Sequence, residues 1–435
     1  MYKIYQRYKV SETKMVGTSD NIDLMTFILG AQHQSEMNAA PVIGSLNHDL
    51  EHLVQTIRQH LGMDVAFLSR FYDGNREMLY VDKRDMCNVS LNIGHKDKNE
   101  ETYCQLIAEE KLPKIIPDTS KNEITKALAV TKVLNIGSYI GVPIYLSDDS
   151  LYGTLCCFSE QADESLTNKD LSILTLFAKF AARNIEKELV ESKAQQVVKD
   201  SIFDIINNRQ LSIVLQPIYD FRTRSVEGFE CLSRFQTEPY RSPDYWFNKA
   251  NASGFGEVLE LFAIEEALNQ LSNIPEQYYI TLNVSPKHLI SAYLQAILDE
   301  APLHRIVLEV TEREPIPDYQ VFRNAIQHFR DRGMRLAVDD AGAGFASFQH
   351  ILELEADIIK LDRSLIANIN SDHRKRALVA ALIGFAKETK STVLGEGVET
   401  LAELEVLQEL GAQKIQGYFF CHPLPLKDVL AFCEA

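Results

Sequence analysis

The chain has 435 residues, of which 46% are hydrophobic, so it can bury more than one core. Its 61 acidic and 44 basic residues give a formal net charge of −17, without a run of Lys and Arg, and this excludes polymeric nucleic acid as a natural partner. Seven cysteines without CxxC spacing indicate reduced thiols in a cytoplasmic protein rather than a disulfide framework or a zinc site. No run of 18 apolar residues predicts a membrane span, and we expect no signal peptide and no membrane partner.

The first part of the chain divides into an arm and a compact module. Residues 1–43 mix charged and polar side chains with one short apolar patch, which predicts a loosely ordered N-terminal arm. An α+β module follows over residues 44–190, beginning with helical spacing of apolar residues in 47–61. Short apolar runs bounded by turn residues predict five strands, the last two joined as a hairpin, at 65–72, 78–81, 114–116, 139–146 and 152–158.

A long helix is predicted over residues 168–206, because apolar side chains recur every three or four residues. The stripe consists of Leu171, Leu174, Ala178, Ala181, Ile185 and Leu189. Two interpretations are open. The stripe packs on the sheet of its own module, or it forms a parallel coiled-coil seam with a second chain. The second interpretation predicts a homodimer, with residues 191–206 as a helical linker.

Several motifs of this module resemble those of GAF domains. They are IGSYIGVPI at 136–144, LYGTLC at 151–156, ETYC at 101–104 and IIPD at 115–118. The resemblance implies a sensory or dimerising module, in which a pocket for an unknown small ligand would be the regulatory site.

Three cysteines of the module need an interpretation. Cys104 could attach a bilin chromophore as in a relative, but the expected neighbouring histidine is Gln105, so a buried structural thiol is favoured. Cys156 and Cys157 are neighbours on one predicted strand and therefore face opposite sides of the sheet. Packing accounts for at least one of them without redox chemistry.

Residues 207–435 alternate between strand-like and helix-like segments, which is typical of βαβ units and a parallel sheet or barrel. Amphipathic helices are expected at 258–271 and 401–410, among others. The eight strand candidates are 211–219, 227–234, 279–284, 305–310, 336–339, 357–361, 392–395 and 414–420. This count predicts a TIM-type (β/α)8 barrel, so that the chain belongs to the α/β class.

The segment RLAVDDAGAG at 335–344 ends a predicted strand with two adjacent carboxylates, Asp339 and Asp340. Alone, it could be a solvated turn, in which Asp and Gly are common. Alternatively, a metal ion offsets the repulsion between the two acids. Polar residues at other strand ends favour the metal, because the strand ends of a barrel converge on one face. These residues are Glu230, Asn283, Glu309, Lys360 with Asp362, Glu396 and Gln416.

The chemistry of this set is that of hard oxygen ligands. Carboxylates and an amide suit Mg²⁺ or Mn²⁺, and two such ions can activate a water for in-line attack at phosphorus. Lys360 and Asp362 lie two residues apart, hence on one strand face, where the ammonium can reach the site and the acid can balance it. A single lysine among acids can hold an attacking hydroxide or the charge that develops at phosphorus.

Eight segments from about residue 203 onward resemble the EAL domain of cyclic di-GMP phosphodiesterases. They are LQPIYD at 215–220, ECLSRF at 230–235, LNVS at 282–285, LEVTE at 308–312, VDDAG at 338–342, IKLD at 359–362, GEGVET at 395–400 and QGY at 416–418. The resemblance implies hydrolysis of cyclic di-GMP to linear pGpG with two Mg²⁺ or Mn²⁺ ions. It further implies metal ligands at Glu230, Asn283, Glu309, Asp339, Asp340 and Gln416, catalytic residues at Lys360 and Glu396, substrate contacts at Gln216 and Arg234, and supporting acids at Glu312, Asp362 and Glu399.

Two positions depart from the family pattern. The signature Glu-Ala-Leu is Glu230-Cys231-Leu232, and Cys231 should point away from the face that carries Glu230. The loop after the acid pair is AGAG at 341–344 and lacks the usual aromatic and hydroxyl residues. This change affects how the loop would communicate with a partner chain, but it removes no metal ligand. The alternative function is a catalytically inactive receptor that binds cyclic di-GMP and signals through the linker helix, and the retained ligand set favours the enzyme.

Overall fold

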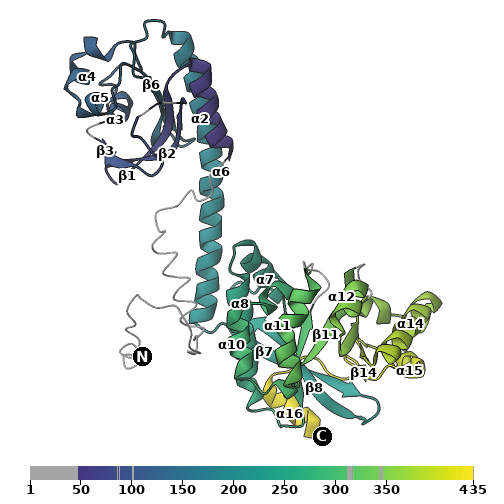
Figure 1. The fold of residues 1–435 in the computed structure, drawn as a ribbon. Coiled ribbons are helices and arrows are strands. Elements are labelled where there is room, and N and C mark those ends of the chain that lie inside the picture. The colour runs from purple at the N-terminus through teal and green to yellow at the C-terminus, as the bar shows by residue number, and fades with distance from the viewer. Residues whose placement is uncertain are drawn as a thin grey trace. The chain divides into compact units, whose positions relative to one another are not determined.

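The computed structural model describes residues 48–434 except for 86, 88, 100, 101, 311–315, 317 and 342–345. The described residues form two compact units, 48–196 and 197–434, labelled by element in Figure 1. The predicted arm at 1–43 and most of the loop at 341–344 lie outside the described residues.

The first unit is built on one antiparallel sheet of six strands in the order β3-β2-β1-β6-β5-β4. All five predicted strands are present, and β5 and β6 form the predicted hairpin. The strand that the sequence did not indicate is β3, because its residues Lys-Asp-Lys carry no apolar pattern. The strands are β1 (Val65–Tyr72), β2 (Asn75–Lys83), β3 (Lys96–Lys98), β4 (Ile115–Ile116), β5 (Ser138–Tyr145) and β6 (Leu151–Ser159).

Helices cover both faces of this sheet (Figure 1). The helix α2 (His48–Leu61) and the first half of α6 (Asn168–Asn207) pack on one face. The other face is covered by α3 (Tyr103–Ala108), η2 (Thr119–Lys121), α4 (Glu123–Ala127) and α5 (Ala129–Val133). Since neighbouring strand residues face opposite ways, Cys157 joins the first core and Cys156 the second, as predicted.

The predicted long helix is present as α6, and its stripe packs on the sheet of its own module, which was the first of the two interpretations. The alternative, a coiled-coil seam formed by this stripe, is wrong. Leu174, Ala178, Ala181 and Ile185 are buried in the core of their own unit, against the sheet and α2. A side chain that already packs on a sheet cannot also form a seam with a second chain. A different set of apolar residues on α6 is exposed, namely Leu176, Phe180, Val190 and Val197.

The second unit contains a closed barrel of eight strands in the order β10-β11-β12-β13-β14-β7-β8-β9, which confirms the predicted barrel. One strand departs from the parallel arrangement, because β7 is antiparallel to both of its neighbours. The cause is the short turn at 221–224, where Asp220 accepts hydrogen bonds from the backbone of Arg222 and Thr223. A turn of this length joins antiparallel strands, whereas a parallel pair needs a crossover. The strands are β7 (Leu211–Asp220), β8 (Ser225–Phe235), β9 (Tyr279–Val284), β10 (Ile306–Val310), β11 (Arg335–Ala341), β12 (Ile358–Leu361), β13 (Thr392–Gly395) and β14 (Lys414–Ile415).

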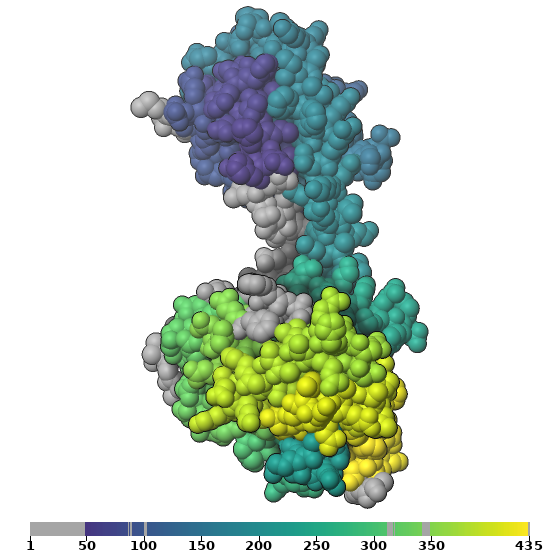
Figure 2. Space-filling view, turned by 90° about the vertical axis from the view of Figure 1, so that its right-hand side faces the viewer, coloured from purple at the N-terminus to yellow at the C-terminus, as the bar shows by residue number. Residues whose placement is uncertain are grey.

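Helices surround the barrel and share one large apolar core with the outward side chains of its strands. The elements are α7 (Pro243–Ala252), α8 (Gly256–Leu271), α9 (Pro286–Leu289), α10 (Ala292–Asp299), η3 (Leu303–Arg305), α11 (Tyr319–Asp331), α12 (Ala346–Leu354), α13 (Arg363–Ile366), α14 (His373–Thr389), α15 (Leu401–Leu410) and α16 (Leu426–Glu434). Figure 2 shows the later segments, yellow-green to yellow, covering one side of this unit. Cys231 is buried in this outer core, as its predicted direction requires.

Inside the barrel, one layer of apolar side chains closes the interior. It consists of Ile218, Tyr279, Val307, Ala337, Ile358 and Leu394, each from a different strand. Because inward positions recur every second residue, the next layer is contributed by residues two positions further on. That layer is polar, and it forms the candidate site.

Candidate functional site

The register of the parallel strands brings acids and a lysine together above the apolar layer. Val307 is followed two residues on by Glu309, Ala337 by Asp339, Ile358 by Lys360 and Leu394 by Glu396. The pairing is staggered, since Glu309 pairs with Ala337 and Lys360 with Leu394, each two residues before the acid of the neighbouring strand. This stagger belongs to a closed barrel of tilted strands, and all four side chains still meet at Lys360. The predicted convergence of these strand ends is therefore present.

The antiparallel strand β7 contributes to the same layer from the opposite chain direction. Gln216, two residues before Ile218 rather than after it, is the partner of Glu230 on β8. Gln416 follows β14, and its amide donates to Glu230 Oε2 and, at 3.0 Å, to Gln216 Oε1. Gln216 in turn donates to the backbone oxygen of Cys421 at 3.2 Å. Both ends of the Gln216 amide are thus engaged, and the residue orients Gln416.

Lys360 is the centre of the layer. Its ammonium Nζ lies 2.7 Å from Glu396 Oε1, 2.8 Å from Glu309 Oε2, 3.1 Å from Asp339 Oδ1 and 3.5 Å from Glu230 Oε1. The lysine is 1% exposed, and each of the four acids is on a different strand or strand end. One ammonium therefore faces four carboxylates in a region from which water is largely excluded.

This surplus of negative charge shifts the proton affinities of the group. Burial alone would lower the pKa of Lys360, but Asp339, Glu230, Glu309 and Glu396 raise it well above its usual value. Burial raises the pKa of Glu309 to about 8, and Glu230 and Asp339 add to the rise while Lys360 opposes it. The pKa of Glu396 is raised for the same reasons. Without a further cation, the acids can relieve their repulsion only by taking up protons.

Asp340 adds a fifth carboxylate beside this layer. The pairing of β11 with β12 shifts between Val338 and Ala341, so Asp339 and Asp340 occupy an irregular stretch in which Asp340 has a φ of 53°. One oxygen each of Asp339, Asp340 and Glu396 can come within 4.8 Å of one another, which is the spacing of ligands to one ion. Among the residues that the structure describes, these three acids are the group of metal-binding side chains that meets this distance criterion.

Two buried oxygens support the fit of a cation. Glu309 Oε1 and Gln416 Oε1 are buried and lack a hydrogen-bond partner among the described residues. A buried oxygen without a partner is costly, and a bound cation would satisfy both atoms. Carboxylate and amide oxygens in this number suit hard divalent ions. The donor set therefore fits the predicted metals.

Asn283 contacts the layer at Glu230, and the chain just after Asn283 is anchored by groups that sequence reasoning missed. Its amide donates to Glu230 Oε1 at 3.4 Å. Two residues on, the backbone N–H and the hydroxyl of Ser285 donate to Glu260 at 3.0 and 2.7 Å, and His288 Nδ1 lies 3.0 Å from the same carboxylate. Glu260 is a buried acid on α8 between apolar neighbours, and this isolated acid in an apolar helix face was the available signal.

Arg234 lies near the layer without touching it. It is half-buried, and its guanidinium donates to the backbone oxygen of Ser233 at 2.8 Å. It lines a hollow of about 320 Å³ together with Asn283, Ser285 and Phe247. A cation and an aromatic ring thus share one hollow with Asn283, whose amide contacts Glu230.

The predicted supporting acids lie elsewhere. Asp362 caps α13 by accepting from Ser364 N at 2.9 Å and is not among the ion-pair partners of Lys360 in the described structure. Asp362 does not balance the charge of Lys360 as expected, because its carboxylate accepts from the backbone at the start of α13 instead. Glu399 pairs with Arg363 at 2.7 Å near the surface. Glu312 lies outside the described residues.

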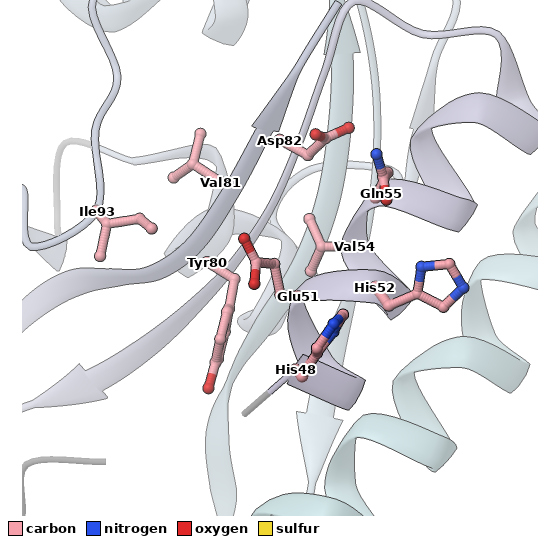
Figure 3. Close-up of a pocket in the computed structure, with 9 residues that line it drawn as sticks. All are labelled: His48, Glu51, His52, Val54, Gln55, Tyr80, Val81, Asp82 and Ile93. Atoms are coloured by element: carbon pink, nitrogen blue, oxygen red, sulfur yellow. The ribbon is translucent and has the colours of Figure 1, made fainter. Parts of the chain in front are cut away.

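The first unit has its own hollow of about 210 Å³ between α2 and β2 (Figure 3). It is lined by His48, Glu51 and His52 of α2 and by Tyr80 and Asp82 of β2, among others. In Figure 3 the ring of His52 points away from the carboxylates of Glu51 and Asp82. These groups therefore do not converge on one ion, and a ligand for this unit stays a prediction.

Fold and site together define an α/β-barrel protein with a buried centre of carboxylates, amides and one lysine at the ends of its strands. The chain belongs to the EAL domain family, whose model matches residues 199–423. The model of the GAF domain matches residues 45–185. Both predicted resemblances are confirmed.

Curated proteins of two bacteria are similar to part of this chain. The oxygen sensor protein DosP of Escherichia coli K12 is 30% identical over 251 residues, which are 54% of this chain and 31% of that protein. The cyclic di-GMP phosphodiesterase NbdA of Pseudomonas aeruginosa PAO1 is 26% identical over 321 residues, 70% of this chain and 40% of that protein. The chain thus spans less than half the length of these curated relatives.

A solved structure shows the same fold. The EAL enzyme Bd1971, in its form with cAMP and cyclic di-GMP bound, matches 85% of this chain and 93% of its own with a TM-score of 0.52 and 19% identity. Within the described part of the chain, no helix combines the length and apolar character needed to cross a membrane.

Proposed function

We propose that the barrel hydrolyses one phosphodiester bond of cyclic di-GMP to give linear pGpG, with two Mg²⁺ or Mn²⁺ ions. The observation that carries the proposal is the buried layer in which Lys360 faces four carboxylates, while Glu309 Oε1 and Gln416 Oε1 lack hydrogen-bond partners among the described residues. The name of NbdA as a cyclic di-GMP phosphodiesterase supports the choice of substrate.

The ions would be held by the oxygens that converge at the layer, from Glu230, Asn283, Glu309, Asp339, Asp340 and Gln416. When bound, two such ions lower the pKa of a water and neutralise charge on the phosphate oxygens. The protein would supply fixed ligands and a dry surrounding, since Glu309 is fully buried and Glu230 nearly so. Gln216 would keep the Gln416 amide in place, so that Gln416 Oε1 faces an ion.

Lys360 and Glu396 would act on the attacking water. Their 2.7 Å contact places a donor and an acceptor side by side at the same point of the layer. The carboxylate of Glu396 can accept a proton from the water, and the ammonium of Lys360 can stabilise the negative charge that develops on attack.

Arg234 would bind a phosphate of the substrate, and the hollow of about 320 Å³ would take the adjoining part of the dinucleotide. A guanidinium suits a phosphate because it donates two parallel hydrogen bonds. Gln216 was predicted to contact the substrate. To do so, its amide would give up its hydrogen bond to the backbone oxygen of Cys421 and donate to the substrate instead.

Turnover of cyclic di-GMP by the full chain with Mg²⁺ or Mn²⁺, followed by chromatography of pGpG, tests this function. The variant Glu230→Gln is expected to lose turnover by on the order of 1000-fold, because a shared ligand loses its charge. Glu405→Gln, an exposed acid on α15, is the charge-matched control and should turn over like the wild type. If the wild type binds cyclic di-GMP but never cleaves it with either metal, the chain is instead the inactive receptor.

We further propose that the chain forms a homodimer through the second half of α6. Val190 and Val197 lie seven residues apart and are 69% and 58% exposed, which is the spacing of one seam in a parallel coiled coil. Size-exclusion chromatography with light scattering measures the oligomeric state. Val190→Glu with Val197→Glu should give a monomer, whereas a monomeric wild type would contradict the dimer.

Control of the barrel by a ligand of the GAF domain and the cytoplasmic location stay predictions.

A further inference from the structure

The first unit contains a pair of buried cysteines that the barrel chemistry does not use. Cys104 lies on α3 and Cys156 on β6, and both are fully buried in the core between the sheet and the helices α3 to α5. Their sulfur atoms are 3.8 Å apart. A disulfide bond is about 2 Å long, so bond formation requires the sulfurs to approach by roughly 2 Å.

A buried guanidinium is aimed at one of these sulfurs. Arg76, which is 3% exposed, donates from Nη1 to Cys104 Sγ at 3.0 Å. Its Nε donates to Asp97 Oδ1 at 2.9 Å, and its Nη2 pairs with the other oxygen of the same carboxylate. The bidentate pair with Asp97 fixes the plane of the guanidinium, so that its remaining edge faces Cys104.

Hydroxyl groups complete the surroundings of the Cys104 sulfur. The Tyr139 hydroxyl lies 3.6 Å away and the Ser69 hydroxyl 3.9 Å away. Together with the guanidinium and the Cys156 thiol, four groups able to donate a hydrogen bond surround one sulfur. Such surroundings stabilise a thiolate over a thiol.

The two thiols of the pair are therefore not equivalent. Burial alone would raise the pKa of Cys104, but the hydrogen bond from Cys156 and the charge of Arg76 bring it well below its usual value. Burial raises the pKa of Cys156 well above its usual value, and the negative charge on Cys104 raises it further. One sulfur is thus prepared as the nucleophile, and the other is held as a protonated partner within reach.

The neighbouring Cys157 shows what an ordinary buried cysteine looks like in this unit. It is also fully buried, but it faces the opposite core, and the described residues offer its sulfur no hydrogen-bond partner. Gly141 gives a second sign of a built arrangement, because a β-carbon there would lie 2.8 Å from Cys156 Sγ. Any larger residue at 141 would push that sulfur aside.

We propose that Cys104 and Cys156 form a redox-active dithiol that a small peroxide oxidises to a disulfide. The Cys104 thiolate attacks one oxygen of hydrogen peroxide, which breaks the O–O bond, forms a sulfenic acid and releases hydroxide. Cys156 gives its proton to that hydroxide, and its sulfur attacks the Cys104 sulfur and displaces the sulfenic oxygen as hydroxide. This hydroxide becomes water by taking up from solvent the proton that Cys104 lost when it ionised. In sum, two thiols and one hydrogen peroxide give one disulfide and two waters.

The size of the adjoining gap limits the oxidant. A gap of about 10 Å³ is lined by Arg76 and Tyr139, which both contact the Cys104 sulfur, and by further apolar residues. This is room for roughly one water molecule. A small peroxide therefore suits this place better than a bulky disulfide reagent does.

Peptide mapping of the full chain tests the proposal. The folded protein is treated with hydrogen peroxide, denatured, blocked with N-ethylmaleimide and digested without reduction. A peptide that links Cys104 to Cys156, with the loss of two hydrogen atoms and recovery of both thiols in dithiothreitol, is expected. Recovery of Cys104 and Cys156 as separately blocked peptides after treatment would overturn the proposal.

Variants test whether the surroundings of the Cys104 sulfur, and not only its short distance to the Cys156 sulfur, set the rate of cross-linking. Arg76→Gln should slow the cross-link about 10-fold, because the thiolate loses its counter-charge, and Cys157→Ser, the matched buried control, should leave the rate unchanged. In Cys156→Ser, dimedone should trap a sulfenic acid on Cys104. An equal rate in the Arg76→Gln protein, or a cross-link that requires Cys157, would contradict the assigned roles. If Cys156→Ser fails to fold, the mapping of the wild type decides.

Discussion

Both units contain a buried cation among acceptor side chains, Arg76 in the first and Lys360 in the barrel, and the two surroundings differ in their balance of charge. Lys360 in the barrel faces four carboxylates within 3.5 Å. Arg76 in the first unit faces one carboxylate, Asp97, and the sulfur of Cys104. Both cations are almost fully buried, at 1% and 3% exposure, so burial alone does not distinguish the two places.

The difference teaches how a buried ionic cluster can be interpreted. A cluster near neutrality stabilises itself, and its geometry prepares a reactive group such as a thiolate. A cluster with three surplus negative charges needs further cations or protons, and that need marks it as a place where metal ions bind. Predictions that change the charge of each cluster therefore have opposite signs.

The largest effect is expected when one acid of the barrel is made neutral. Asp339→Asn should lower turnover of cyclic di-GMP by on the order of 1000-fold, because a ligand charge is lost. In metal-free buffer the same change should leave the barrel as stable as the wild type or more stable, since it relieves repulsion. Urea denaturation followed by the fluorescence of Trp246, the single tryptophan, reports on the barrel. A metal-free barrel that Asp339→Asn destabilises would contradict the surplus of charge.

Breaking the balanced cluster should destabilise the first unit. Arg76→Met leaves the partly exposed Asp97 carboxylate without its partner and should cost about 3 kcal/mol in free energy of unfolding. Differential scanning calorimetry of the full chain measures this, with Arg84→Met as the control, because Arg84 is an exposed arginine paired with Asp64. If Arg76→Met and Arg84→Met lower the free energy of unfolding equally, the buried Arg76 pair contributes no more to stability than the exposed Arg84 pair.

Divalent ions should stabilise the barrel and leave the first unit unchanged. At a Mn²⁺ concentration 100 times its dissociation constant, the barrel should gain about 2.7 kcal/mol per site. The transition followed by Trp246 should rise in temperature with Mn²⁺ and return with EDTA. A rise confined to the first unit would place the ions elsewhere.

The smallest effect is expected at Arg234, a half-buried cation for which the described residues offer no ion pair. Arg234→Ala should raise KM for cyclic di-GMP roughly 10-fold while it changes kcat little, because the lost contact is to a non-reacting phosphate. Arg222→Ala, at the opposite end of the barrel strands, is a suitable control. A fall in kcat alone would show that Arg234 acts on the reaction rather than on binding.

Much of the fold and of the site followed from local patterns. The predicted strand ends brought Glu309, Asp339, Lys360 and Glu396 to one face, because the parallel strands of a barrel end on the same side. The helix α6 and the hairpin of β5 and β6 were evident for the same reason, since each depends on neighbours within a few residues.

Other features depended on contacts between distant segments. The direction of β7, the packing of the α6 stripe on its own sheet and the change of Asp362 from site residue to helix cap were decided by what each segment met in space. The contacts of Cys104 with Arg76 and Cys156 join residues 28 and 52 positions apart. No periodic pattern reports such pairs, because side-chain periodicity states which face a residue occupies, while only the folded chain determines which other face lies against it.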